Sequence, residues 1–256
     1  MTTALVPPTG TALPAIHPLR FPTLLAVELR KMTDTRSGRG LLAVTVAASA
    51  AVLVWKLTHS SIETSFDNYS AGVATMVAFV TPLIGLLAMT SEWTQRTALT
   101  TFTLAPRRLP VITAKYVASL VLSLATVAVG LAMAAGACAI GGIVHGPADF
   151  SGWLGDVRYA AIFVVLQVTM AAAFGALAAN TPAALSAFLL APTLWAVLAQ
   201  GALRPVAGWL DIFEAYGRLS SDRPLDEIGR TLTAIAVWVV VPAAIGLARS
   251  LRREIK

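Results

Sequence analysis

Long apolar stretches alternate with short charged segments along this chain, and this alternation is its strongest pattern. The six stretches that are free or nearly free of charged residues cover 40–57, 70–90, 115–144, 159–179, 183–203 and 231–248. A helix needs about 20 mostly apolar residues to cross the hydrocarbon core of a bilayer. The pattern therefore predicts an all-α, polytopic membrane protein with six transmembrane helices in a single transmembrane domain over residues 20–256.

The first and third stretches depart from the ideal length. Residues 41–55 offer only 15 uncharged positions, so the first span is comfortable only if Lys56 extends its amine to the far interface. The third stretch is longer than a bilayer requires and is expected to tilt. Residues 1–19 are rich in Pro, Thr and Gly and are predicted to form a disordered cytoplasmic tail instead of a signal peptide.

The composition agrees with this picture, because 57% of the residues are hydrophobic and only 12% are charged, against about 25% in soluble domains. The formal net charge is +6, and topology explains it. If the N-terminus is inside, thirteen Lys and Arg residues fall on the inner side and six on the outer side. Since basic residues resist translocation, both termini are predicted to be cytoplasmic, and no nucleic-acid partner is needed.

The predicted spans lack ionisable residues at depth and lack known catalytic motifs. No Asp, Glu, Lys or Arg lies well inside any of them, which argues against an ion-coupled carrier or a voltage sensor. No nucleophile elbow, zinc helix or paired aspartates within spans occur, so no catalytic residue and no metal site are predicted. The chain has no Gly-Lys pair for a P-loop. It is therefore not expected to be an enzyme or to hold a cofactor, and a partner must supply any ATP-driven motion.

The segment 21–36 is the first notable feature of the predicted cytoplasmic face. Its apolar stripe consists of Phe21, Leu25, Leu29 and Met32. Its charged residues, including Glu28, lie largely off that stripe, and Pro22 suits a first helical turn. An amphipathic helix just before a span is expected to lie in the plane of the membrane interface.

The loop between the second and third spans is the second feature. Its distinctive residues are Glu92, Arg96, Thr97, Leu99, Phe102, Pro106, Arg107, Arg108 and Lys115. Glu92 and Arg96 have the spacing of a favourable helical pair, and the prolines around the Arg pair predict a break after a short helix. A soluble motor could hold such a helix, or Arg107 and Arg108 could simply anchor the next span to anionic lipid heads. The residues alone leave both possibilities open.

The same loop resembles a family motif. Its residues Glu92, Thr97, Leu99, Pro106, Arg108 and Lys115 are similar to the pattern Glu-x(3 or 4)-Gly-Thr…Leu…Pro-x-Arg…Lys of ABC-2 type exporter permeases. Six spans with both ends inside are also similar to that family. Arg96 occupies the position of the usual glycine, which is a departure from the pattern.

The resemblance implies a permease subunit of an ATP-binding cassette exporter that forms the substrate pathway, dimerises, and docks a separate ATPase subunit that binds the ATP and Mg. It implies an elbow helix at 21–36, a coupling helix within 92–105 and a second, smaller ATPase contact at 180–182. The stretch 204–230 is similar to the family's short re-entrant or extracellular helices, although a plain amphipathic helix at the outer interface fits it equally.

A few polar residues in the spans could line a pathway. Ser186, Thr193 and Gln200 recur every seven residues on the fifth span, and Gln167 adds polarity to the fourth. Hydrogen bonding between helices of one subunit is the favoured explanation for them. Hydrophobic drugs, lipids and apolar peptides are all compatible substrates. A non-transporting membrane component, such as a mechanical relay, a sensor or an immunity protein, is the alternative function.

Overall fold

The computed structural model describes residues 20–59, 63–95, 107–200, 204–221 and 223–252, which are almost entirely helical. The helices are α1 (Phe21–Asp34), α2 (Arg36–Thr58), α3 (Phe66–Thr94), α5 (Arg108–Val144), α6 (Trp153–Ala178), α7 (Thr181–Leu198), α8 (Arg204–Leu210), α9 (Ile212–Ser220), α10 (Ile228–Ile235), the π-helix η1 (Ala236–Val240) and α11 (Val241–Arg252). Within these ranges no strand forms beyond an isolated bridge between Ser65 and Asp149. The all-α prediction is confirmed.

Six helical segments are long and apolar enough to cross a membrane: α2, α3, α5, α6, α7 and the continuous run α10–η1–α11. This agrees with the six predicted spans, although the ends differ. The first span is longer than predicted, because its helix begins at Arg36 and not at residue 40. Thr35 has extended backbone angles and accepts a hydrogen bond from the Gly38 backbone N–H, so it separates α1 from α2. The fifth helix ends at Leu198, before the predicted end at 203.

In the last turn of α2, the Lys56 side chain binds the neighbouring helix α3. Its Nζ donates a hydrogen bond of 2.6 Å to the Asn68 carbonyl oxygen and another to the Asn68 side chain. Its methylene stem lies against Gly72. The amine therefore extends toward the end of the span, as the sequence predicted, but it binds the first turn of α3.

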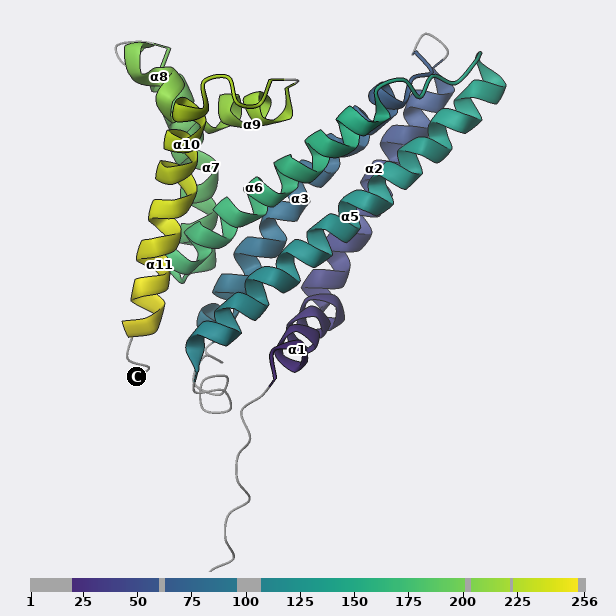
Figure 1. Ribbon diagram of the computed structural model, residues 1–256. Coiled ribbons are helices and arrows are strands. Elements are labelled where there is room, and N and C mark those ends of the chain that lie inside the picture. Colours follow the sequence, from purple (N-terminus) through teal and green to yellow (C-terminus); the bar gives the residue numbers. More distant parts are fainter. Residues whose placement is uncertain (1–19, 60–62, 96–106, 201–203, 222, 253–256) are drawn as a thin grey trace, which may run out of the picture.

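The helices form two groups that meet along α6 (Figure 1). Helices α2, α3, α5 and α6 lie side by side, while α7 and α10–α11 form the second group against the far end of α6. The beginning of α1 and the end of α11 lie at the same end of the molecule. We call this end, which also holds the C-terminus of α3 and the N-terminus of α5, the terminal end; the opposite end is the loop end.

Glycines let α3 and α6 approach closely in the half of the bundle nearer the terminal end. A methyl group added to Gly85 would lie 2.8 Å from the Val168 carbonyl oxygen, and one added to Gly175 would lie 3.0 Å from the Leu86 carbonyl oxygen. Leu86 and Val168 are fully buried at this crossing. Backbone-to-backbone contact through small residues is the usual way in which helices pack tightly in a bilayer.

Gly85→Ala should therefore destabilise the bundle by about 2 kcal/mol, as overpacking of a tight core does. Gly136→Ala in α5 is the matched control, because nothing lies within 4 Å of its added methyl group and a helical Gly→Ala change is otherwise stabilising by roughly 0.5–1 kcal/mol. Thermal unfolding of both variants in one detergent measures the difference. Equal melting temperatures for the two variants would contradict this close crossing.

The stretch 204–230 contains short helices, as predicted. Helix α9 is capped by Asp211, whose Oδ1 accepts hydrogen bonds from the Phe213 and Glu214 backbone N–H groups. Tyr216 of α9 is buried, and its hydroxyl donates to the Met170 sulfur at 3.5 Å. Burial raises the pKa of Tyr216. Helix α9 thus packs against the middle of α6.

Candidate functional site

Two carboxylates and two lysines from three helices meet at the terminal end. Lys115 of α5 has its Nζ 3.0 Å from Glu28 Oε2 of α1 and 2.9 Å from Glu92 Oε1 of α3. Lys31 of α1 has its Nζ 2.7 Å from Glu28 Oε1 and 3.3 Å from Glu92 Oε1. We call Glu28, Lys31, Glu92 and Lys115 the four-residue ion cluster. Each lysine contacts both carboxylates, and the formal charges balance.

Three of the four members of the cluster are deeply buried. The side chains of Glu28 and Lys115 are each 6% exposed, that of Glu92 is 11% exposed and that of Lys31 is 45% exposed. Removing a charge from water costs several kcal/mol unless a partner compensates it. Each of these buried groups lies within 3.0 Å of a group of opposite formal charge, which makes the relative placement of α1, α3 and α5 specific.

Local sequence places each member. Glu92 occupies the last turn of α3, and Lys115 lies two turns into α5, so the two stand on either side of the connection between those helices. Glu28 and Lys31 are three residues apart and share one face of α1. Burial alone would lower the pKa of Lys31, but its hydrogen bond to Glu28 and the charges of Glu28 and Glu92 outweigh this and raise the pKa.

The structure places Glu28 of α1 where the sequence pattern does not. The sequence pattern places Glu28 on the polar side of the helix, yet it is the one residue of α1 that is fully buried. Within the predicted apolar stripe, Leu25, Leu29 and Met32 are only half-buried, and Phe21 is exposed. Burial of Glu28 is possible because Lys115, 87 residues away in the sequence, neutralises it. The spacing within α1 carries no signal of a partner so distant.

Arg108 joins α5 to the end of the last helix. Its Nη1 donates to the Ser250 carbonyl oxygen at 2.8 Å and to the Leu251 carbonyl oxygen at 3.5 Å. Arg249 in turn donates to the Leu177 carbonyl oxygen at 3.0 Å, near the end of α6. Arg108 thus binds protein carbonyls, a contact that neither hypothesis for the Arg pair includes. Arg107, just before α5, is exposed.

Five of the predicted coupling-loop residues lie outside the described residues. They are Arg96, Thr97, Leu99, Phe102 and Pro106. Among the remaining loop residues, the structure brings Glu92 and Lys115 together. It also brings the Arg108 side chain of α5 into contact with the backbone of α11.

The predicted second contact at 180–182 also lies beside the end of α3. Thr181 Oγ1 donates to Thr90 Oγ1 at 2.8 Å and lies 3.0 Å from Thr94 Oγ1. Asn180 caps α7, since its Oδ1 accepts from the Ala183 backbone N–H. Hydroxyl contacts therefore connect the short 180–182 turn to the helix that carries Glu92.

The candidate pathway residues do not form one surface. Ser186 and Thr193 of α7 and Gln200 just beyond its end are exposed, whereas Gln167 of α6 is buried. The Thr193 hydroxyl donates to the Leu189 carbonyl oxygen of its own helix. On the same helix as Gln167, the Thr169 hydroxyl lies 2.7 Å from the Tyr116 hydroxyl of α5. This contact joins α6 to α5.

Across the described ranges, no three His, Cys, Asp or Glu side chains gather in a geometry that could hold a metal ion. Comparisons of the chain with known protein families, with curated proteins and with solved structures find no match. Among the described residues, polar side chains at the terminal end join α1, α3, α5, α6, α7 and α11 through the ion cluster and the carbonyl and hydroxyl contacts.

Proposed function

We propose that this chain is the transmembrane permease subunit of an ABC-2 type ATP-binding cassette exporter. Six helices suited to spanning a membrane, spans without charges well inside them, and the absence of a Gly-Lys pair support a transporter that depends on a separate motor. The Glu92…Lys115 pattern supports the family assignment.

The terminal end is proposed to face the cytoplasm of a bacterial plasma membrane. The exposed basic residues there include Arg30, Arg36 and Arg39 near α1, and Arg252 at the end of α11. Cytoplasmic segments carry the excess of Lys and Arg in membrane proteins. In this orientation α1 is the elbow helix, and the connection between α3 and α5 faces the ATPase subunit.

The observation that carries the proposal is the position of the four-residue ion cluster. Glu92 and Lys115 flank the connection between α3 and α5, and both belong to the cluster that holds Glu28 of α1. A motor that pulls on this connection would therefore move three helices as one body. Packed helices respond to such a displacement by rigid-body shifts and do not deform smoothly.

The other terminal-end contacts would carry the movement to the second group of helices. Arg108 leads to α11, and Thr181 leads to α7. The exposed residues Ser186 and Thr193 of α7, with Gln200 just beyond its end, point away from their own bundle. In a homodimer, these residues are proposed to face the second copy and to contribute to the substrate pathway.

Affinity purification of the tagged chain from its native host, in mild detergent, tests the proposal. A nucleotide-binding subunit should co-purify, and the complex in proteoliposomes should move solute only when ATP is supplied. Glu92→Gln should abolish that movement, whereas Arg36→Gln, at an exposed position of the terminal end, should not. A complex that never contains an ATPase would overturn the proposal. Hydrolysis without solute movement would instead identify a mechanical relay.

A further inference from the structure

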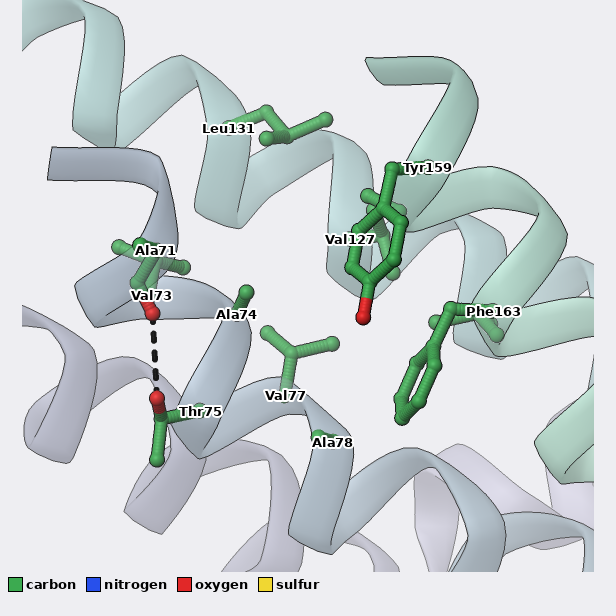
Figure 2. A pocket seen from close by; sticks show the side chains of 12 residues that line it. Ala71, Val73, Ala74, Thr75, Val77, Ala78, Val127, Leu131, Tyr159 and Phe163 are labelled. Carbon is green, nitrogen blue, oxygen red and sulfur yellow. Dashed lines mark hydrogen bonds between the residues drawn. The ribbon is translucent and has the colours of Figure 1, made fainter. Parts of the chain in front are cut away.

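A cavity of about 310 Å³ lies between α3, α5 and α6 on the side of the Gly85 crossing nearer the loop end. Figure 2 shows its walls: Ala74 and Ala78 of α3 face Tyr159 and Phe163 of α6, and Val127 of α5 stands behind them. The lining is apolar, apart from the Tyr159 hydroxyl and Thr75. The Thr75 hydroxyl is already satisfied by the Ala71 carbonyl oxygen at 3.1 Å.

The helix crossing explains why a cavity exists here. Gly85 and Gly175 bring α3 and α6 into backbone contact nearer the terminal end. Toward the loop end, α3 presents small side chains at Ala71, Ala74 and Ala78. Alanine cannot fill the space that the facing rings leave, so the walls lack contact partners unless another molecule supplies them.

Tyr159 and Phe163 of α6 form the aromatic side of the cavity, and Phe163 packs against other rings. The Phe163 ring lies 5.9 Å from the Tyr159 ring and 5.4 Å, edge to face, from the Tyr216 ring of α9. Tyr216 is itself buried and bonded to Met170. The Phe163 ring is therefore preformed in the wall of the cavity, because Tyr216 of α9, which does not line the cavity, packs against it.

The position of the cavity along the helices limits its occupant. All lining residues belong to helices suited to spanning the membrane. The cavity begins at Ala71 and Tyr159, one turn inward from Asp67 and Asp156, which lie in the first turns of α3 and α6. It thus extends from the edge of the apolar layer inward. Its apolar lining offers water few hydrogen-bond partners, so the site favours an apolar occupant.

We propose that this cavity binds one hydrocarbon chain of a membrane phospholipid. A phospholipid has its headgroup at the interface and its chains in the apolar layer, which matches a site that starts one turn inward from the first turns of α3 and α6 and continues between apolar walls. The volume lies at the lower end of the roughly 300–1,000 Å³ of small-molecule sites. Tyr159 stands at the mouth, where an aromatic ring with a polar tip suits the interface. The site requires membrane insertion only and is independent of the proposed transport function.

Native mass spectrometry of the purified chain, released from detergent in the presence of phosphatidylcholine, tests the site. One lipid per chain should remain bound to the wild type. The double variant Ala74→Phe/Ala78→Phe fills the cavity and should reduce the retained fraction at least tenfold. The control Ala47→Phe/Ala51→Phe adds the same rings to exposed positions of α2, away from the cavity, and should retain the lipid as the wild type does.

A second measurement on the unaltered chain guards against misfolding of the filled variant. Phosphatidylcholine with a diazirine in one acyl chain should crosslink to the α3 segment 71–78 and to the α6 segment 159–164, and unlabelled lipid should compete. Crosslinks spread evenly over the exposed faces of α2 and α7, or equal retention by both double variants, would overturn the site.

Discussion

Lys115→Met should destabilise the helical bundle strongly, because it breaks the four-residue ion cluster at its most buried cation. The change removes the amine that lies within 3.0 Å of both Glu28 and Glu92 and leaves two buried carboxylates to share the half-exposed Lys31. Breaking a buried ion pair from one side costs about 3–5 kcal/mol. Thermal unfolding in detergent, followed by size-exclusion chromatography, should show a large fall in melting temperature or loss of the folded peak.

Companion variants separate the charge effect from loss of packing. Adding Glu28→Gln to Lys115→Met removes one of the two uncompensated carboxylates and should restore part of the stability, which independent sites would not do. Lys31→Met should cost about 1 kcal/mol or less, because that side chain is 45% exposed and its ion pairs are screened by water. Similar losses for Lys31→Met and Lys115→Met would contradict the buried character of the cluster.

Glu28→Gln with Lys31→Gln should uncouple transport from hydrolysis if the chain is an exporter permease. The pair removes the charges that α1 contributes to the cluster but keeps the 2.9 Å contact between Lys115 and Glu92, so α3 and α5 stay joined while α1 is released. Solute movement in proteoliposomes with the partner ATPase should fall roughly tenfold or more, equivalent to about 1.4 kcal/mol of coupling free energy. Hydrolysis by the ATPase should continue.

The matched control uses the same helix. Arg30 and Asp34 form an exposed pair at 2.9 Å, and Arg30→Gln with Asp34→Asn removes as many charges from α1 without touching the cluster. This control should transport within about twofold of the wild type, as expected for a surface pair. Equal losses from the two double variants would show that α1 acts through its general charge and not through the cluster.

The spans could be predicted from the sequence because the signal for each span lies within its own residues. An uncharged run of suitable length is a local property, and all six predicted runs coincide with helices. Their ends are harder to predict, since Arg36 and Arg39 sit inside the first turns of α2 although they are charged. A helix can extend beyond the apolar layer into the interface, because long charged side chains at its end reach water.

The ion cluster could be predicted only in half. Glu92 and Lys115 stand out because they flank one loop, and that loop has an unusual sequence. Glu28 looks like any solvent-facing residue of an amphipathic helix, and only the tertiary packing of α1 against α5 reveals its partner. The close crossing at Gly85 and the cavity beyond it are equally hidden, because they depend on which faces of α3 and α6 meet.

The 87-residue separation between Glu28 and Lys115 also sets an order of events during synthesis. At translation rates of about 5–20 residues per second, α1 emerges roughly 4–17 s before its partner lysine exists. Throughout that interval Glu28 can pair only with Lys31 of its own helix, and α5, against which it is buried, is not yet present, so it stays hydrated at the membrane surface. Docking of α1 is therefore a late step of biogenesis that waits for α5 to insert, and a chain truncated before α5 should leave its first helix accessible to protease.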